Sequence, residues 1–159
     1  MPNMDKKFTT PKYSFGVCGE FAFQAHMDIN YQFELDNLSN TNKYSVVDFR
    51  IPTTNIYIEL KTRTCTSTAF STTYFDKSKV DRWNRSKQFK NAIIYIAFAF
   101  KDGQYYCIKY SKRLFSKFKT SYRSDWDQTN YKIPLSTCIN TDKIITQINK
   151  LKPNCLHVN

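Results

Sequence analysis

The run NAIIYIAFAF, residues 91–100, constrains the fold more than any other stretch, because it is almost unbroken in apolar, β-branched and aromatic residues. A strand buried on both faces has this composition, whereas a half-exposed strand alternates apolar and polar residues. Asp102-Gly103 follows at once and is a strong hairpin signal, with a return strand over Gln104–Tyr110. The sequence therefore predicts a central buried strand and an antiparallel neighbour.

Three stretches have the apolar spacing of helices: residues 14–27, Ser78–Phe89 and Thr141–Leu151. Ser14 is a candidate cap for the first helix, and Ser78 with Asp81 is a candidate capping box for the second. In the first helix the apolar stripe consists of Phe15, Cys18, Ala22 and Ala25.

Further strands are predicted before the second helix. Tyr31–Leu35 alternates and is a candidate short strand, and Tyr44–Ile51 and Ile56–Thr62 are joined by a Pro/Thr/Asn turn that fits an antiparallel pair. Residues 62–73 have no periodicity and are predicted to form a loop. The expected fold class is α/β (α+β), with a central mixed β-sheet flanked by helices. We expect one domain over residues 1–159, with a loose lead-in at 1–13 and a basic C-terminal extension and closing helix at 111–159.

Charge is unevenly distributed along the chain. The net charge is +11, and residues 80–159 carry fifteen of the 24 Lys and Arg but only five of the 13 Asp and Glu. Such an excess favours a polyanionic partner such as nucleic acid, because it concentrates phosphates near the surface. Solubility is an equally simple explanation, as is a biased genome, since Lys, Asn, Ile and Tyr are frequent in AT-rich coding sequence, viral or cellular.

Composition also argues against several classes of protein. No run approaches the roughly 20 apolar residues of a membrane span, and the first residues lack the apolar stretch of a signal peptide. We therefore expect a protein of the cytoplasm, nucleus or a viral factory that is not secreted. Five scattered cysteines without a CxxC pair disfavour a zinc site or a disulfide framework, and most are expected to be small buried residues. With only three glycines in the chain, the sequence disfavours a Gly-rich loop that cradles a nucleotide.

Charged residues interrupt the two strands that flank the Pro/Thr/Asn turn. Glu59 and Lys61 are two residues apart, so their side chains lie on one face of the strand and Leu60 lies on the other. If the strands pair across the turn, Asp48 meets them on that face. Carboxylate oxygens at strand ends suit Mg²⁺, which would activate a water for attack on a phosphate. The simpler alternative is a Glu–Lys pair on a solvent-facing strand.

This constellation resembles the PD-(D/E)XK nuclease superfamily, which has the restriction-endonuclease-like fold. The match is Asp48, ten intervening residues and then Glu59-Leu60-Lys61, within a helix, hairpin, basic helix and buried strand that span roughly residues 14–110. Position 47 is Val where the motif's name has Pro. The last 50 residues match no known pattern.

The resemblance implies specific roles for these residues. Asp48, Glu59 and the backbone carbonyl of Leu60 would ligate Mg²⁺, for which Mn²⁺ would substitute, and Glu20 on the first helix would add to the metal shell. Lys61 would be the catalytic lysine. Lys79 would contact phosphate or support catalysis.

Cations elsewhere are candidates for holding the nucleic-acid backbone. In residues 111–132, cations alternate with aromatic residues. These aromatic side chains either stack on unpaired bases or face the core, and the sequence does not decide between the two roles. The candidate nucleic-acid-binding residues are Arg63, Lys77, Lys79, Arg82, Arg85, Lys87, Lys112, Arg113, Lys117, Lys119 and Arg123.

The favoured function is a metal-dependent deoxyribonuclease, most simply an endonuclease, that is structure-selective or of low sequence specificity. A homodimer would allow it to cut two strands. The alternatives are a non-catalytic nucleic-acid-binding module on the same fold and a structural or host-interaction protein. Replacing Asp48 or Lys61 distinguishes the first two, because only the enzyme loses an activity.

Overall fold

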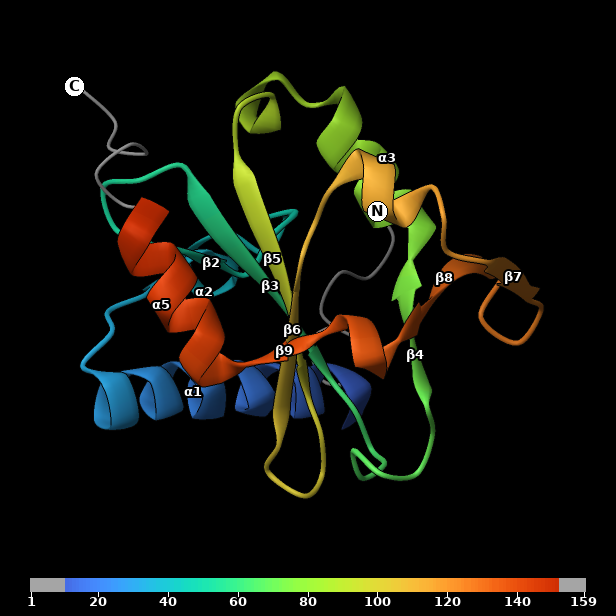
Figure 1. Cartoon of the computed structure of the whole chain (residues 1–159), viewed down its shortest axis with the longest axis horizontal. Coiled ribbons are helices and arrows are strands. Elements are labelled where there is room, and N and C mark those ends of the chain that lie inside the picture. The colour runs from blue at the N-terminus through green and yellow to red at the C-terminus, as the bar shows by residue number, and fades with distance from the viewer. Residues whose placement is uncertain (1–10, 152–159) are drawn as a thin grey trace, which may run out of the picture.

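The structure, a computed structural model, describes residues 11–151 of the chain. It is a mixed α+β fold in which helices flank a mixed central sheet (Figure 1). The helices are α1 (Pro11–Tyr31), α2 (Leu38–Thr41), α3 (Lys77–Arg85), α4 (Lys112–Phe115) and α5 (Thr141–Leu151), with short 3-10 turns at Lys87–Phe89 and Leu135–Thr137.

Two sheets are present in the described chain. The strands are β1 (Asp36–Asn37), β2 (Phe49–Arg50), β3 (Ile56–Thr62), β4 (Thr72–Asp76), β5 (Ile93–Ala99), β6 (Tyr105–Lys109), β7 (Thr120–Arg123), β8 (Gln128–Pro134) and β9 (Ile139–Asn140). The central sheet has the order β1-β2-β3-β5-β6-β9, and only its β3–β5 pair is parallel. The second sheet has the order β4-β8-β7 and is antiparallel.

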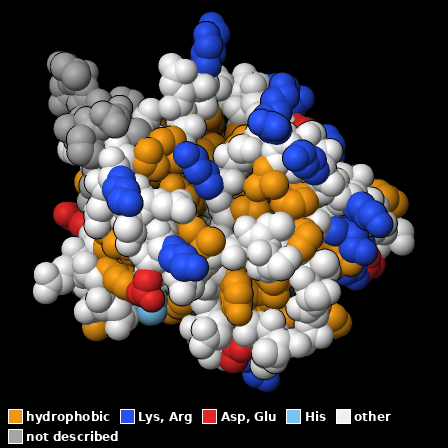
Figure 2. Space-filling model, viewed as in Figure 1, with side chains coloured by type: hydrophobic (Ala, Val, Ile, Leu, Met, Phe, Trp, Pro, Cys, Tyr) orange, Lys and Arg blue, Asp and Glu red, His pale blue; other side chains and the backbone are white. Residues whose placement is uncertain are grey.

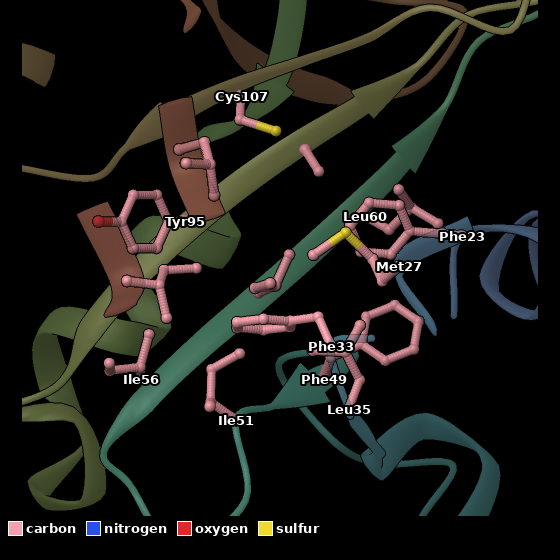
Figure 3. Packing of buried hydrophobic residues seen from close by; sticks show 14 of the residues in the cluster. Phe23, Met27, Phe33, Leu35, Phe49, Ile51, Ile56, Leu60, Tyr95 and Cys107 are labelled. Carbon is pink, nitrogen blue, oxygen red and sulfur yellow. The ribbon is translucent and has the colours of Figure 1, made fainter. Parts of the chain in front are cut away.

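Hydrophobic side chains pack on both faces of the central sheet. On one face, Phe23 and Met27 of α1 and Ile148 of α5 pack against β3 and β5 (Figure 3). On the other face, Trp83 of α3 and Ile133 of β8 belong to a second cluster. β3 and β5 are therefore covered on both sides, which explains why the 91–100 run carries so few polar residues.

The crossover from β3 to β5 positions α3. Parallel neighbours cannot be joined by a tight turn, so the chain passes through β4 and α3 before it returns as β5. Asp76 caps α3 by accepting a hydrogen bond from the Ser78 backbone N–H at 2.8 Å. The predicted capping box of Ser78 with Asp81 is thus wrong, since Asp81 pairs with Lys77 at 2.9 Å instead.

Several predicted boundaries need correction. The candidate strand at Tyr31–Leu35 is wrong, because α1 extends to Tyr31 and the next strand is the two-residue β1. The strand expected over Tyr44–Ile51 is reduced to β2, and β4 was not predicted at all. Ser14 lies inside α1, which begins at Pro11, so it is not the cap. Residues 1–10 of the expected lead-in lie outside the described part of the chain.

Other predictions agree with the structure. β3, the β5–β6 hairpin and α5 occupy the predicted ranges within a few residues. By contrast, the described part of the predicted extension, residues 111–151, belongs to the sheets, because it contributes β7 and β8 to the second sheet and β9 to the central one. The expectation that most cysteines are buried is wrong for the described chain, because only Cys107 is buried, Cys65 and Cys138 are half-buried and Cys18 is exposed. Within residues 11–151, no helix combines the length and the apolar character that a bilayer span needs.

Gly19 allows α1 to approach β3 closely. A Cβ built at Gly19 would lie 2.2 Å from Thr62 Oγ1, whereas a Cβ at Gly16 would meet nothing within 4 Å. Gly19→Ala is therefore expected to lower the free energy of unfolding by about 1–3 kcal/mol through overpacking. Gly16→Ala on the same helix is expected to raise it by about 0.5–1 kcal/mol, because Ala has the higher helix propensity. Urea denaturation of both variants measures this, and equal effects would contradict the close approach.

Candidate active site

Glu59 is a fully buried carboxylate in the middle of β3. Its neighbours Ile58 and Leu60 pack in the α1 and α5 cluster, so the alternation of the strand turns Glu59 to the opposite face, toward α3. Its exposed fraction is 0%. Burial raises the pKa of Glu59, but the attraction of Lys61 and Lys79 outweighs this, and the net effect is a pKa below the usual value. Glu59 is therefore held as a charged group inside the fold.

Two ammonium groups share one oxygen of Glu59. Lys61 Nζ lies 3.0 Å from Glu59 Oε1, and Lys79 Nζ of α3 donates to the same oxygen. Lys61 is 31% exposed and thus reaches solvent beside the buried carboxylate. Burial alone would lower the pKa of Lys61, but Glu59 and Asp48 raise it above its usual value. Lys61 consequently remains a charged donor rather than a base.

Asp48 precedes β2 and lies against the backbone of β3. Its Oδ2 accepts a hydrogen bond of 2.8 Å from the Leu60 N–H. β2 pairs with β3 at Phe49–Ile58, so the register extended by one residue sets Asp48 opposite Glu59. Burial, followed by repulsion from Glu59, raises the pKa of Asp48 to about 7. Asp48, Glu59 and Lys61 thus come together as predicted, and the carboxylate of Asp48 bonds the backbone of β3.

The Leu60 carbonyl lies on the edge of β3 that Asp48 occupies. In a strand, the N–H and C=O of one residue point to the same edge, and the Leu60 N–H points to Asp48. β2 is too short to pair with β3 here, so this carbonyl is not covered by a strand partner on that side. The Leu60 carbonyl, which the family resemblance implies as a main-chain ligand, therefore faces the same edge of β3 as Asp48.

Glu20 approaches the same region from α1. Ser39 Oγ donates to Glu20 Oε2 at 2.5 Å, and Glu59, Lys79 and Lys61 all influence its ionisation. Burial is the largest effect and the pKa of Glu20 is raised. Ser39, from α2, is a member of the site that no sequence pattern indicated, because its position depends on how α1 and α2 pack.

Of the three carboxylates predicted to bind Mg²⁺, the structure brings together two, Asp48 and Glu59. Within residues 11–151, no group of three or more His, Cys, Asp or Glu side chains is arranged to hold a metal. Asp48 and Glu59 nevertheless place two carboxylates together, and Glu59 Oε2 is buried without a hydrogen-bond partner in the described chain. Mg²⁺ commonly binds through one or two carboxylates plus water, so a buried oxygen without a partner beside a second acid suits it.

The predicted nucleic-acid-binding residues fall into two groups. Most remain exposed, on α3, α4 and the segments that follow them: Arg82, Arg85, Lys87, Lys112, Arg113, Lys117 and Lys119. Figure 2 shows Lys and Arg side chains spread over one face, including the part where Figure 1 places α3 and the second sheet. These residues are available to phosphates.

The remaining predicted cations have partners within the protein. Arg63 is a structural residue, because its Nε donates to Thr73 Oγ1 at 3.0 Å and its guanidinium also bonds the Tyr74 carbonyl. Lys77 pairs with Asp81, and Arg123 pairs with Asp125 at 2.9 Å and stacks 3.9 Å from the Trp126 ring centre.

The aromatic residues of 111–132 divide between the two roles that the sequence left open. Phe115 is buried and Phe118 packs against the second hydrophobic cluster. Tyr122 and Trp126 are exposed, at 62% and 45%. The first pair belongs to the core, whereas the second pair lies at the surface, where Arg123 stacks on Trp126 and the Tyr122 hydroxyl donates to Asp127 Oδ1 at 2.6 Å.

No family model, curated protein or solved structure matches the chain. The resemblance to the PD-(D/E)XK superfamily therefore remains a prediction from the motif of Asp48 and Glu59-Leu60-Lys61.

Proposed function

We propose that the protein is a small Mg²⁺-dependent nuclease of the PD-(D/E)XK type, with a restriction-endonuclease-like core, that hydrolyses phosphodiester bonds in DNA. The observation that carries the proposal is Glu59, a fully buried carboxylate that holds two ammonium groups on one oxygen and leaves the other without a partner. Buried ion pairs of this kind are often no more stabilising than apolar residues of equal volume. A catalytic role therefore explains the buried Glu59 with its two ammonium partners better than a contribution to stability does.

The chain's own residues divide the work of hydrolysis. Asp48, Glu59 and the Leu60 carbonyl would hold the cation, and Glu20 with its Ser39 partner lies near enough to influence their charge. The bound cation would supply a water of lowered pKa and neutralise phosphate charge. Lys61, kept protonated by Glu59, would donate to the phosphate oxygens as negative charge develops on them.

The exposed cations suit recognition of the DNA backbone rather than of base sequence. Arg82 and Arg85 lie on α3, the helix that delivers Lys79 to Glu59, so a backbone along α3 would pass beside the site. Phosphate contacts fix orientation without reading sequence. The proposal therefore includes structure-selective or weakly specific cleavage, with a homodimer as the simplest route to cutting both strands.

Lys61→Ala is expected to lower the cleavage rate by about 10²–10³-fold, because it removes a positioned donor to the developing charge. The assay follows labelled single-stranded, duplex and branched DNA with Mg²⁺, with Mn²⁺ and with EDTA. Lys143→Ala on α5 is the matched control, since Lys143 is exposed and belongs to no part of the site. Cleavage that persists in EDTA, or that Lys61→Ala retains in full, would contradict the proposal.

One observation favours a non-catalytic nucleic-acid-binding module as the second candidate. Lys61 and Lys79 already neutralise Glu59 in this structure, so the acidic site is stable without a cation. In that case the same assay gives salt-sensitive binding and no cutting by any variant.

A further inference from the structure

A hollow extends from the acidic residues along the loop that follows α2. It has a volume of about 680 Å³, within the usual size of small-molecule sites. Glu20 and Asp48 line it together with Phe21 of α1 and Tyr44 of the loop. Its remaining lining is largely neutral and polar, from Ser39, Asn40, Thr41, Asn42 and Ser45.

Tyr44 stands between this hollow and a second one. The second hollow, of about 360 Å³, is lined by Tyr44, Asn42 and Ser45 again, and by Arg82 and Ser86 near the end of α3. Tyr44 is 69% exposed. An extended ligand that lies across Tyr44 would thus contact Glu20 and Asp48 on one side and Arg82 of α3 on the other.

Hydrogen bonds hold the backbone of the loop that carries Tyr44. The Tyr44 N–H donates to Asn42 Oδ1 at 3.0 Å, and the Ser45 N–H donates to the Asn42 carbonyl at 2.9 Å. Trp83 Nε1 of α3 donates to the Val46 carbonyl at 2.9 Å and ties the loop to that helix. Because the backbone of the loop is already ordered, a flat partner that stacks on the ring does not incur the entropic cost of ordering the loop.

The lining of the larger hollow suits a nucleobase better than a phosphate. Among the described residues that line it, Lys43 is the only cation, and Glu20 and Asp48 would repel an anion. Lys43 Nζ lies over the Tyr44 ring, 5.2 Å from its centre, so a base that stacks on that face must displace this flexible side chain. Amide and hydroxyl groups can hydrogen-bond the edge of a base, while Tyr44 and Phe21 offer aromatic surfaces for stacking.

We propose that this hollow binds an unpaired nucleotide of DNA, stacked on Tyr44, beside the site of cleavage. In a duplex, the faces of a base are stacked on its neighbours and its edge is paired, so only an unpaired base has these surfaces available. The inference rests on the proposed nuclease function and makes it specific: the substrate carries a single-stranded stretch next to the scissile bond, as in an overhang or flap.

The test measures binding separately from cutting. Two DNA hairpins of one stem sequence are compared, one blunt and one with a single-stranded overhang that contains 2-aminopurine, both in EDTA so that no cleavage occurs. The proteins are the wild type, Tyr44→Ala, Tyr44→Trp and Phe70→Ala, the last a matched control because Phe70 is also exposed, at 67%, and lines neither hollow.

The wild type and Tyr44→Trp are expected to quench 2-aminopurine and to bind the overhang more tightly than the blunt stem. Tyr44→Ala is expected to lose the quenching and to weaken overhang binding by about 5- to 100-fold, with blunt binding unchanged. Phe70→Ala should behave as the wild type. Equal binding of both hairpins by the wild type, or of the overhang by Tyr44→Ala, would overturn the inference, as would a larger effect with an RNA overhang.

Failure of the inference and failure of the nuclease proposal give different results. If quenching depends on Tyr44 but the protein never cuts DNA in Mg²⁺, the nucleotide site is supported and the nuclease proposal is contradicted. If the protein cuts DNA in a metal-dependent way and Tyr44→Ala has no effect, the nuclease proposal is supported and the nucleotide site is contradicted.

Discussion

Asp48→Asn is expected to stabilise the metal-free protein above pH 7 by about 2–4 kcal/mol, because it removes a carboxylate whose charge the fold disfavours. Burial and the nearby Glu59 raise the pKa of Asp48 to about 7. Asn has the shape of the protonated acid and retains an oxygen that accepts from the Leu60 N–H. The same substitution should abolish metal-dependent cleavage, so stability and activity change in opposite directions.

The pH dependence of this effect has a defined sign. With a folded-state pKa of about 7, Asp48 retains its proton where the unfolded chain, with a value of 3.8, has lost it. Its contribution to stability is therefore complete below about pH 4 and is lost as the pH rises to about 7. The difference between Asp48→Asn and the wild type should grow across this interval, as measured by urea denaturation in EDTA.

Added Mg²⁺ supplies the control for Asp48→Asn. A cation bound only by the folded state stabilises it by about 2.7 kcal/mol at a hundred times its dissociation constant. We expect Mg²⁺ to raise the melting temperature of the wild type and to leave Asp48→Asn nearly unchanged. A variant that is less stable than the wild type in EDTA above pH 7 would show that the Asp48 charge is not disfavoured by the fold.

Glu59→Gln is expected to have the largest destabilising effect, with a loss of about 3–5 kcal/mol in the free energy of unfolding. The substitution keeps the shape of the side chain but leaves two ammonium groups without their common counter-charge. Lys79 is only 19% exposed, so water cannot fully replace Glu59. Denaturation at neutral pH measures the change.

The α3 helix offers a control for Glu59→Gln. Asp81→Asn breaks the Lys77–Asp81 pair, in which both side chains are about 40% exposed, and is expected to cost less than about 1 kcal/mol. The double variant Glu59→Gln with Lys79→Met should recover part of the loss, because it also removes one of the buried charges. If Glu59→Gln costs no more than Asp81→Asn, the two ammonium groups do not depend on Glu59.

Periodic and strongly apolar segments of the fold could be predicted from the sequence. α5 begins and ends where its isoleucine spacing indicates, and β5 follows from an apolar run that fits only a covered strand. The apolar stripe of α1 also predicts a helix, but not which side is buried. Phe15 and Cys18 of that stripe are exposed, whereas Phe23 and Met27 enter the core, because contacts with the sheet decide the orientation.

The second sheet could not be predicted, because its strands are short and distant in the chain. β4 pairs Thr73 with Ile133, sixty residues apart, and no local pattern links two such strands. Pairing of this kind depends on the completed fold rather than on local propensity. The loop interpretation of residues 62–73 was correct for most of its length and failed at its end for this reason.

The candidate site was predictable where it depends on alternation within one strand. Glu59 and Lys61 had to share a face, and the turn brought Asp48 to them. The contact between Glu20 and Ser39, and the exposed position of Tyr44 between two hollows, depend on packing between elements that carry no shared motif. Such residues become visible only in the folded chain.

The most direct test of the central claim is single-turnover cleavage of an overhang-bearing DNA by the wild type and by Asp48→Asn, in Mg²⁺ and in EDTA, with binding measured in parallel. The account predicts cutting only by the wild type and only in Mg²⁺, with DNA bound about equally by both proteins. Binding without cutting by the wild type in Mg²⁺ or Mn²⁺, or equal cutting by Asp48→Asn, would contradict it.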